Sequence, residues 1–311
     1  MKKYFFLYIL ILIIFISSCK NGTVTTHTTV ASPTIAHSPS PVVEPDQKPL
    51  VLACIPYESE LKLLKAWQYL ADYLAGQIGI PVKLEIKKSY TPIIDGLKSG
   101  DIDLANTGPL IYIKAHDIAG ATPLVKPIAI KASAPNYKSY IIVRKDSGIE
   151  NIAQLKGKKF AFTDKESASG YLMPVLMLSE AGVNNTNFFS EIRYTGDHDS
   201  SLSAVYNSYV DAAGISNYIY TKGVDKRLGD LKIIKESDQI PTAPIVARAG
   251  MSEELIQKIK KAFLNIDTTK EETKEIIEIL KLEGYTEAYD KDYASIRKAQ
   301  KALETMGLTS E

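Results

Sequence analysis

The feature that most restricts the fold of this 311-residue chain is an alternation of strand-like and helix-like segments. The short apolar run Leu50–Ile55 precedes Leu61–Ile78, where apolar residues recur every three or four positions. Val82–Ile86 then alternates apolar and charged residues, Tyr90–Lys98 has helical spacing, and Gly100–Ala105 resembles a strand again. This order predicts an α/β fold in which a mostly parallel sheet is flanked by helices.

The alternation continues beyond the first hundred residues of the expected domain. Ser139–Arg144 predicts a strand that leaves the first unit, and a second αβ series follows to about Gln239. Ile240–Arg248 is an extended segment that can return to the first unit. The chain then ends in three predicted helices, which are Met251–Ile266, Thr268–Leu282 and Asp292–Met306.

Two loops, Pro56–Ser59 and Asn106–Pro109, are expected near a ligand because each follows the carboxyl end of a predicted strand.

A third loop lies in Phe160–Pro174. Its strand-like residues are followed by Ser167-Ala168-Ser169-Gly170, and then by a helical pattern. The start of a helix carries free N–H groups and partial positive charge, which favours an anion. The alternative is that a serine only caps the helix.

The first residues have the features of an export signal. Lys2 and Lys3 precede an apolar run at Phe5–Ile16 that is short for a membrane span. Ile16-Ser17-Ser18-Cys19 resembles the lipobox of bacterial lipoproteins, which implies acylation of Cys19. The alternative is an ordinary signal peptide. Residues 20–48 are rich in Thr, Ser and Pro and predict a disordered tether.

Composition and the lack of certain short motifs argue against nucleic-acid binding, a disulfide and a metal or cofactor. The 37 basic and 36 acidic residues are balanced, which argues against binding of nucleic acid. Cys54 is the only cysteine after Cys19, so the mature domain has no intrachain disulfide. Neither H-E-x-x-H nor C-x-x-C occurs, and no cofactor or metal is expected.

Several segments together resemble the phosphate/phosphonate-binding (PhnD-like) periplasmic substrate-binding proteins of ABC importers. They are spread over nearly the whole mature chain: Asp101–Tyr112, Leu155–Phe162, Asp164–Gly170, Gly196–Asp199, Ala204–Asp211 and Ile240–Arg248. The resemblance implies a type II periplasmic-binding-protein fold with two lobes, each a mixed sheet flanked by helices. A hinge of two chain segments would join the lobes, with the ligand in the cleft between them.

The expected organisation is a lipoprotein signal peptide (1–19), a tether (20–48), lobe 1 (49–138), lobe 2 (139–239), and a return to lobe 1 with the C-terminal helices (240–311). The resemblance also carries site residues over to this chain. Ser167, Ala168, Ser169 and Gly170 match the oxyanion loop, and His198 matches a histidine that reaches the ligand oxygens. The remaining expected ligand contacts are Tyr57 as an aromatic wall, Thr107, Gly108 and Tyr112 in the loop of lobe 1, and Asn217.

Asn217 and Ala243 stand where binders of aminoalkylphosphonates in this family keep carboxylates. Their presence favours a ligand with a small or uncharged tail, such as phosphate, phosphite or methylphosphonate.

The resulting hypothesis is a monomeric extracytoplasmic lipoprotein that is not an enzyme. It captures a phosphorus oxyanion and delivers it to an ABC permease and ATPase, touching the membrane only through its lipid anchor. One alternative is a ligand sensor that signals to a membrane receptor. A less favoured one is a hydrolase using Ser167, His198 and Asp199, although S-A-S-G lacks the G-x-S-x-G elbow.

Overall fold

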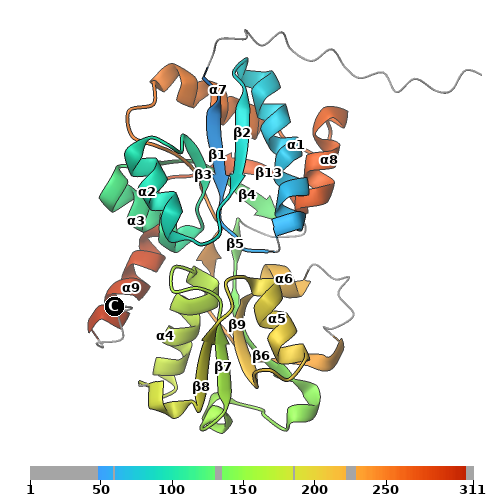
Figure 1. Cartoon of the computed structure of the whole chain (residues 1–311), viewed down its shortest axis with the longest axis vertical. Coiled ribbons are helices and arrows are strands. Elements are labelled where there is room, and N and C mark those ends of the chain that lie inside the picture. Colours follow the sequence, from blue (N-terminus) through green and yellow to red (C-terminus); the bar gives the residue numbers. More distant parts are fainter. Residues whose placement is uncertain (1–47, 59, 130–134, 185, 222–228, 306–311) are drawn as a thin grey trace, which may run out of the picture. The chain divides into compact units, whose positions relative to one another are not determined.

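The structure is a computed structural model that describes residues 48–58, 60–129, 135–184, 186–221 and 229–305 (Figure 1). The predicted signal peptide, Cys19 and all of the tether except Lys48 lie outside the described residues. In the described part of the chain, no helix combines the length and hydropathy that a membrane span requires.

The first sheet has the strand order β13-β4-β12-β3-β1-β2. Strand β1 pairs in parallel with β2 and β3, whereas β12 and β13 run antiparallel to their neighbours. The sheet is therefore mixed, as the resemblance implied, and its antiparallel strands β12 and β13 come from the C-terminal part of the chain. Its strands are β1 (Leu50–Cys54), β2 (Val82–Ile86), β3 (Leu104–Asn106), β4 (Thr122–Ala129), β12 (Ile245–Ala247) and β13 (Leu282–Glu287).

Helices cover both faces of this sheet because its strands alternate their apolar side chains between two cores. Leu52 and Cys54 of β1 pack in the core under α1, α7 and α8, whereas Ala53 packs in the core under α2, α3 and α9. We call this sheet and its helices the first lobe. The helices are α1 (Glu60–Ile78), α2 (Thr91–Ser99), α3 (Pro109–Ala119), α7 (Glu253–Leu264), α8 (Glu271–Leu280) and α9 (Ala294–Thr305).

The second sheet has the strand order β10-β6-β9-β7-β8 and is also mixed. Its two faces pack against α4 on one side and α5 on the other. This sheet and its helices are called the second lobe below. Its elements are β6 (Ser139–Arg144), β7 (Lys159–Phe162), β8 (Glu191–Tyr194), β9 (Ala212–Ser216), β10 (Leu231–Glu236), α4 (Met173–Glu180), α5 (His198–Tyr206) and α6 (Asn217–Thr221).

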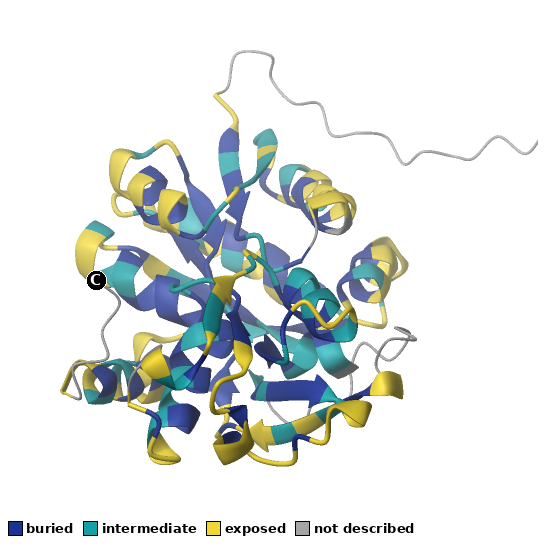
Figure 2. Cartoon of the chain, turned by 60° about the horizontal axis from the view of Figure 1, so that its bottom comes forward, coloured by how far each residue is buried: buried dark blue, intermediate teal, exposed yellow. Residues whose placement is uncertain are grey.

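Two short strands lie in the chain segments that run between the lobes. Strand β5 (Asn136–Tyr137) precedes β6, strand β11 (Ile240–Pro241) follows β10, and the two pair antiparallel. The architecture agrees with the predicted type II fold of two lobes joined by two segments. In Figure 2, the strands of both sheets are largely buried, and the exposed residues lie on outer helix faces and loops.

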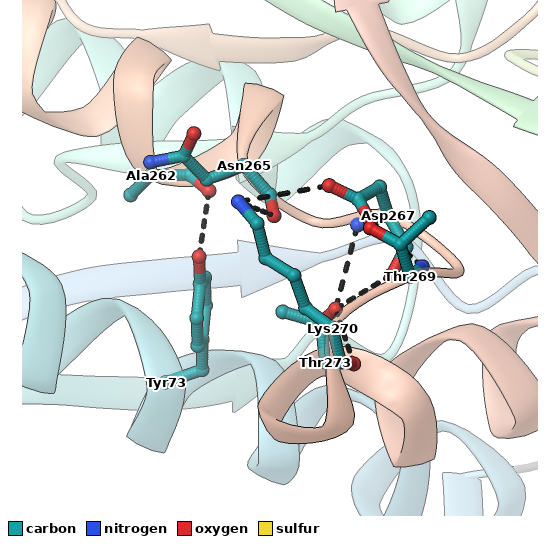
Figure 3. A network of polar contacts seen from close by, with 7 residues as sticks. All are labelled: Tyr73, Ala262, Asn265, Asp267, Thr269, Lys270 and Thr273. Atoms are coloured by element: carbon teal, nitrogen blue, oxygen red, sulfur yellow. Dashed lines mark hydrogen bonds and ion pairs between the residues drawn. The ribbon is translucent and has the colours of Figure 1, made fainter.

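A polar network fixes the C-terminal helices of the first lobe against α1 (Figure 3). The Tyr73 hydroxyl donates to the Ala262 carbonyl at 3.0 Å, which ties α1 to α7. The buried Thr273 hydroxyl donates to the Asp267 carbonyl at 2.8 Å, so the first turn of α8 holds the loop that follows α7. Satisfying these buried polar groups lets the connection between α7 and α8 pack closely.

Three boundaries differ from the sequence expectation. The helix predicted over Thr268–Leu282 ends at Leu280, and Leu282 begins strand β13, which was not predicted. The pattern of Ser201–Asn207 predicts a helix that starts at Ser201, but the helix begins at His198, because the Asp197 side chain caps it by accepting from the Ser200 N–H at 2.8 Å. The helix after Ser167 opens with a π-helical turn, Ala168–Leu172, before α4.

Candidate functional site

A cavity of about 150 Å³ is lined by residues of both lobes and of β5. The first lobe contributes mostly the ends of β1 and β3, Trp67 of α1 and residues near β12 and β13. The second lobe contributes the loop before α4 and the starts of α5 and α6. The lining residues are Ile55, Tyr57, Trp67, Tyr90, Asn106, Gly108, Pro109, Pro127, Ala129, Tyr137, Glu166, Ser167, Ala168, Ser169, His198, Ser216, Tyr218, Ile219, Thr242, Ala243, Ile245, Leu280, Leu282 and Tyr285.

The predicted serine loop lines this cavity. Ser167 is the cap of the π-helical turn, and its Oγ accepts from the Gly170 N–H at 2.9 Å. The first N–H groups of a helix lack intrahelical acceptors, and Ala168 and Ser169 follow Ser167 directly and line the cavity. The loop thus combines a cap with amide and hydroxyl donors next to the cavity, so the two interpretations of the motif do not exclude each other.

His198 lies beside this loop, at the start of α5, and is 4% exposed. The Ser216 N–H donates to His198 Nδ1 at 3.1 Å, and Nε2 lies 3.4 Å from the Ser169 hydroxyl. A backbone N–H can only donate, so Nδ1 carries no proton and the neutral ring has its hydrogen on Nε2. Burial lowers the pKa of His198 to about 4, which keeps the ring neutral at pH 7.

Gly170 is not among the residues that line the cavity. A Cβ atom there would lie 2.2 Å from Thr163 Oγ1 and 2.4 Å from Thr163 Cβ. The Thr163 N–H also donates to the Gly170 carbonyl at 3.1 Å, so the end of β7 packs directly on the turn. The glycine is thus explained by close packing, which brings the serine loop against the sheet.

The loop after β1 places an aromatic pair at the cavity. Tyr57 follows the strand, and its hydroxyl accepts from the Trp67 Nε1–H of α1 at 3.1 Å. Because the tyrosine oxygen accepts from the indole, its own hydrogen is available to another acceptor. Burial raises the pKa of Tyr57, so the phenol stays protonated. Trp67 was not among the predicted ligand contacts.

Two further tyrosines meet the serine loop and were not predicted. Tyr90 precedes α2 in the first lobe, and its hydroxyl lies near the Ser167 side chain. Tyr137 lies in β5, and its hydroxyl lies near the Ser169 side chain. Both residues line the cavity, and burial raises both pKa values. Tyr90 had been counted as the first residue of a helix, and no local pattern connects it to a loop 77 positions later.

Three other predicted contacts do not line the cavity. The Thr107 hydroxyl donates to the Pro244 carbonyl at 3.5 Å. The Tyr112 hydroxyl donates to Asp290 Oδ1 at 2.7 Å, and its ring packs on Tyr293. Asn217 Oδ1 accepts from the Lys138 N–H at 3.0 Å, which joins the start of α6 to the start of β6. Of the predicted loop of the first lobe, Gly108 does line the cavity.

The cavity is uncharged apart from one paired carboxylate. Its described lining residues include neither Lys nor Arg. Glu166 lines it, but its carboxylate lies 2.6 Å from the Lys114 ammonium of α3 in the first lobe. Apolar and aromatic residues also line it, with Trp67, Leu280 and Tyr285 among them. An anion bound here would be held by neutral donors, and its substituent would meet an apolar wall.

The described residues contain no group of three or more His, Cys, Asp or Glu side chains placed to hold a metal ion.

Comparison with known proteins adds independent findings. A sequence model of the family described as "ABC transporter, phosphonate, periplasmic substrate-binding protein" matches residues 52–293. The chain is 32% identical over 227 residues to the phosphate-import protein PhnD of Mycolicibacterium smegmatis, covering 69% of this chain and 70% of that protein. It is 30% identical over 279 residues to the phosphonates-binding periplasmic protein of Escherichia coli, covering 86% and 80%.

Comparison with solved structures agrees with the family match. The crystal structure of a binding-protein component of an ABC phosphonate transporter from Pseudomonas aeruginosa superposes with a TM-score of 0.78 at 25% sequence identity. The alignment covers 84% of this chain and 88% of that one.

Proposed function

Because the chain belongs to the phosphonate family of periplasmic substrate-binding proteins of ABC transporters, we propose that it captures a phosphorus oxyanion in the cavity described above. Phosphate, phosphite and small phosphonates form the proposed ligand class. The names of the relatives, which refer to phosphate import and to phosphonate binding, support this class.

The observation that carries the proposal is the set of neutral donors among the residues that line the cavity. The set comprises the hydroxyls of Ser167 and Ser169, the first amides of the π-helical turn and the Nε2–H of His198. Hydrogen bonds to a charged acceptor contribute roughly 1.5–3 kcal/mol each, so several of them replace a cationic side chain. The positive end of the helix favours the same charge.

The tail of the ligand is proposed to be small and uncharged. Ala243 lines the cavity, and Asn217 holds the backbone of Lys138 instead of lining it. A cavity of 150 Å³ has about the volume that accommodates benzene in an engineered protein core, so it exceeds the needs of an oxyanion by little. The apolar wall would therefore favour a methyl or similar group over an ammonium group.

The tautomer of His198 favours binding over hydrolysis. A serine hydrolase needs an unprotonated Nε2 that accepts the serine proton, with Nδ1–H donating to an acid. Here the Ser216 N–H occupies Nδ1, so Nε2 carries the hydrogen and faces the Ser169 hydroxyl as a donor. In that state the ring stabilises a negative oxygen and does not activate the serine.

Delivery to an ABC importer completes the proposal. Cys19 would anchor the mature chain by a lipid, and the tether of residues 20–48 would give the domain reach. The lobes would open and close about the β5–β11 pair, since both connecting segments pass through it. If the chain partitions into detergent only when Cys19 is present, that result would support the lipid anchor.

Calorimetry on the mature domain tests the ligand class. We expect saturable binding of phosphate, phosphite or methylphosphonate. The Ser167→Ala/Ser169→Ala variant should lose at least about tenfold in affinity, equal to about 1.4 kcal/mol. Ser252→Ala is the matched control, because Ser252 also caps a helix, α7, yet does not line the cavity. No heat with any of these ligands, or equal affinity of the double variant and the wild type, contradicts the proposal.

A further inference from the structure

Ser139 carries a buried hydroxyl in the second lobe and is not among the predicted ligand contacts. It is the first residue of β6, directly after the segment that runs between the lobes, and it is 0% exposed. Its hydroxyl donates to the Ser169 carbonyl at 2.6 Å. Ser139 does not line the cavity, so any effect that it has on a ligand must pass through the serine loop.

The Ser169 carbonyl needs a donor from outside its own helix. In the π-helical turn the Met173 N–H donates to the Ala168 carbonyl, which belongs to the residue five positions earlier. In the same pattern the donor to the Ser169 carbonyl would be Pro174, and proline has no N–H. Buried carbonyls are rarely left unpaired, and the Ser139 hydroxyl supplies the missing donor.

The peptide between Ser169 and Gly170 is thereby held at both of its polar groups. Its carbonyl accepts from the Ser139 hydroxyl, and its N–H donates to Ser167 Oγ at 2.9 Å. Because the Ser167 oxygen accepts from this N–H, the directions left for the hydrogen of its hydroxyl are restricted. A chain of contacts therefore runs from β6 through one peptide to a side chain that lines the cavity.

Ser139 itself is fixed by the second connecting segment. Its N–H donates to Ser237 Oγ at 2.9 Å, and the Ser237 N–H donates to the Ser139 carbonyl at 2.9 Å. Ser237 follows β10 and precedes β11. Because both polar groups of the Ser139 backbone are paired, its hydroxyl is held at one place beside the turn.

We propose that Ser139 is a positioning residue for ligand binding, which holds the peptide between Ser169 and Gly170 so that the donors of the serine loop keep one arrangement. This inference rests on the proposed function. Donors that are already ordered bind an anion more tightly, because ordering them on binding costs free energy. Without the Ser139 hydroxyl this peptide is free to rotate, and its carbonyl can then turn toward an anion and repel it.

Calorimetry with phosphate, phosphite and methylphosphonate tests this role. Ser139→Ala should bind the tightest of these probes about fivefold more weakly than the wild type, and Ser139→Thr, which keeps the hydroxyl, should recover most of the affinity. Thr273→Val is the matched control, because the fully buried Thr273 hydroxyl also donates to a backbone carbonyl, that of Asp267, yet Thr273 does not line the cavity. This control should bind like the wild type.

A double-mutant cycle separates positioning from a general loss of stability. If Ser139 acts through the peptide that Ser167 also holds, Ser139→Ala should change the affinity by less than about twofold in the Ser167→Ala background. A loss of stability alone would weaken binding by the same factor in both backgrounds. If Ser139→Ala binds like Thr273→Val, or if its effect is the same with and without Ser167, the inference is overturned.

Hydrogen exchange supplies a measurement that needs no ligand. Ser139→Ala should raise the exchange rate of the Gly170 amide at least about tenfold, because the peptide loses one of its two fixed groups, whereas Thr273→Val should leave that rate unchanged. An unchanged rate in Ser139→Ala also overturns the inference. If the wild type binds no phosphorus probe while the Gly170 amide exchanges faster in Ser139→Ala, the proposed function has failed and the hold of Ser139 on the loop has not.

Discussion

At the scale of single residues, the protonation state of His198 follows from the backbone N–H that donates to its ring. The Ser216 N–H on Nδ1 and the burial of the ring both oppose a second proton, and the pKa of His198 falls to about 4. In the unfolded chain the imidazole titrates near its ordinary value of about 6.5. Between these values the unfolded chain binds a proton that the folded chain does not.

This difference predicts a pH dependence of stability. The folded state keeps its full stability above about pH 6.5 and loses it as pH falls toward about 4, by up to about 3 kcal/mol. His198→Gln keeps a neutral donor and should flatten the curve in that window. The measurement is urea unfolding of both proteins at intervals from pH 7 to pH 4.

The control for this experiment is His116→Gln. The His116 ring contacts the Ala121 carbonyl oxygen instead of a backbone N–H, so this variant controls for the loss of an imidazole as such. A wild-type curve that is flat over this range, or an equal slope in His198→Gln, would show that the imidazole is protonated in the folded protein.

At the scale of elements, the π-helical turn Ala168–Leu172 depends on a glycine. The tight contact between Gly170 and Thr163 lets β7, the turn and β9 pack together, and a Cβ atom at Gly214 of β9 would lie 2.5 Å from Pro174 Cγ of α4. Gly170→Ala would place a methyl group 2.4 Å from Thr163 Cβ, so the turn must shift. Overpacking of this kind costs about 1–3 kcal/mol.

We therefore expect Gly170→Ala to lower the free energy of unfolding by about 2 kcal/mol and to weaken ligand binding, because the shift moves the serine loop. Denaturant unfolding and calorimetry measure the two effects. Gly229→Ala is the control, since a Cβ atom at Gly229 meets nothing within 4 Å. Wild-type stability and affinity in Gly170→Ala would mean that the turn accommodates a Cβ atom at this position without a shift.

The same elements show how far a sequence can predict this protein. Strands with continuous apolar runs, such as β6 over Ser139–Arg144, were confirmed to the residue. Strand β13 was missed because Leu282–Glu287 contains Gly284 and no alternation, and only pairing with β4 makes it a strand. The π-helical turn was also beyond prediction, because it depends on contacts with β7 and β9 that are distant in sequence.

The candidate site likewise contains residues that the sequence could predict and residues that it could not. The serines and His198 carry a local signal, a small-residue turn before a helix and a polar helix start, and the structure brings them together. Tyr90 and Tyr137 reach the same serines only through the packing of separate elements.

At the scale of the whole molecule, several contacts join the two lobes around the cavity. The His198 N–H donates to the Tyr57 carbonyl at 3.3 Å, and the Tyr218 hydroxyl donates to the Leu280 carbonyl. Helix α9 packs against α3 of the first lobe and α4 of the second. The ion pair between Lys114 and Glu166 also crosses between the lobes, and its two side chains are 26% and 17% exposed.

This ion pair has two effects on a bound anion that can be separated. It holds the lobes together, and it neutralises a carboxylate that lines the cavity. Lys114→Gln removes both effects and should weaken oxyanion binding by about tenfold. Lys114→Gln/Glu166→Gln also removes the repelling carboxylate, so it should recover part of the loss and remain about two- to fivefold weaker than the wild type.

Salt provides the second measurement for this pair. Screening weakens partly exposed charges, so the difference between the double variant and the wild type should shrink at high ionic strength. Lys260→Gln is the matched control, because Lys260 pairs with Glu287 at 2.7 Å entirely within the first lobe. If Lys114→Gln binds like Lys260→Gln at every salt concentration, contacts other than this ion pair hold the ligand-bound lobes together.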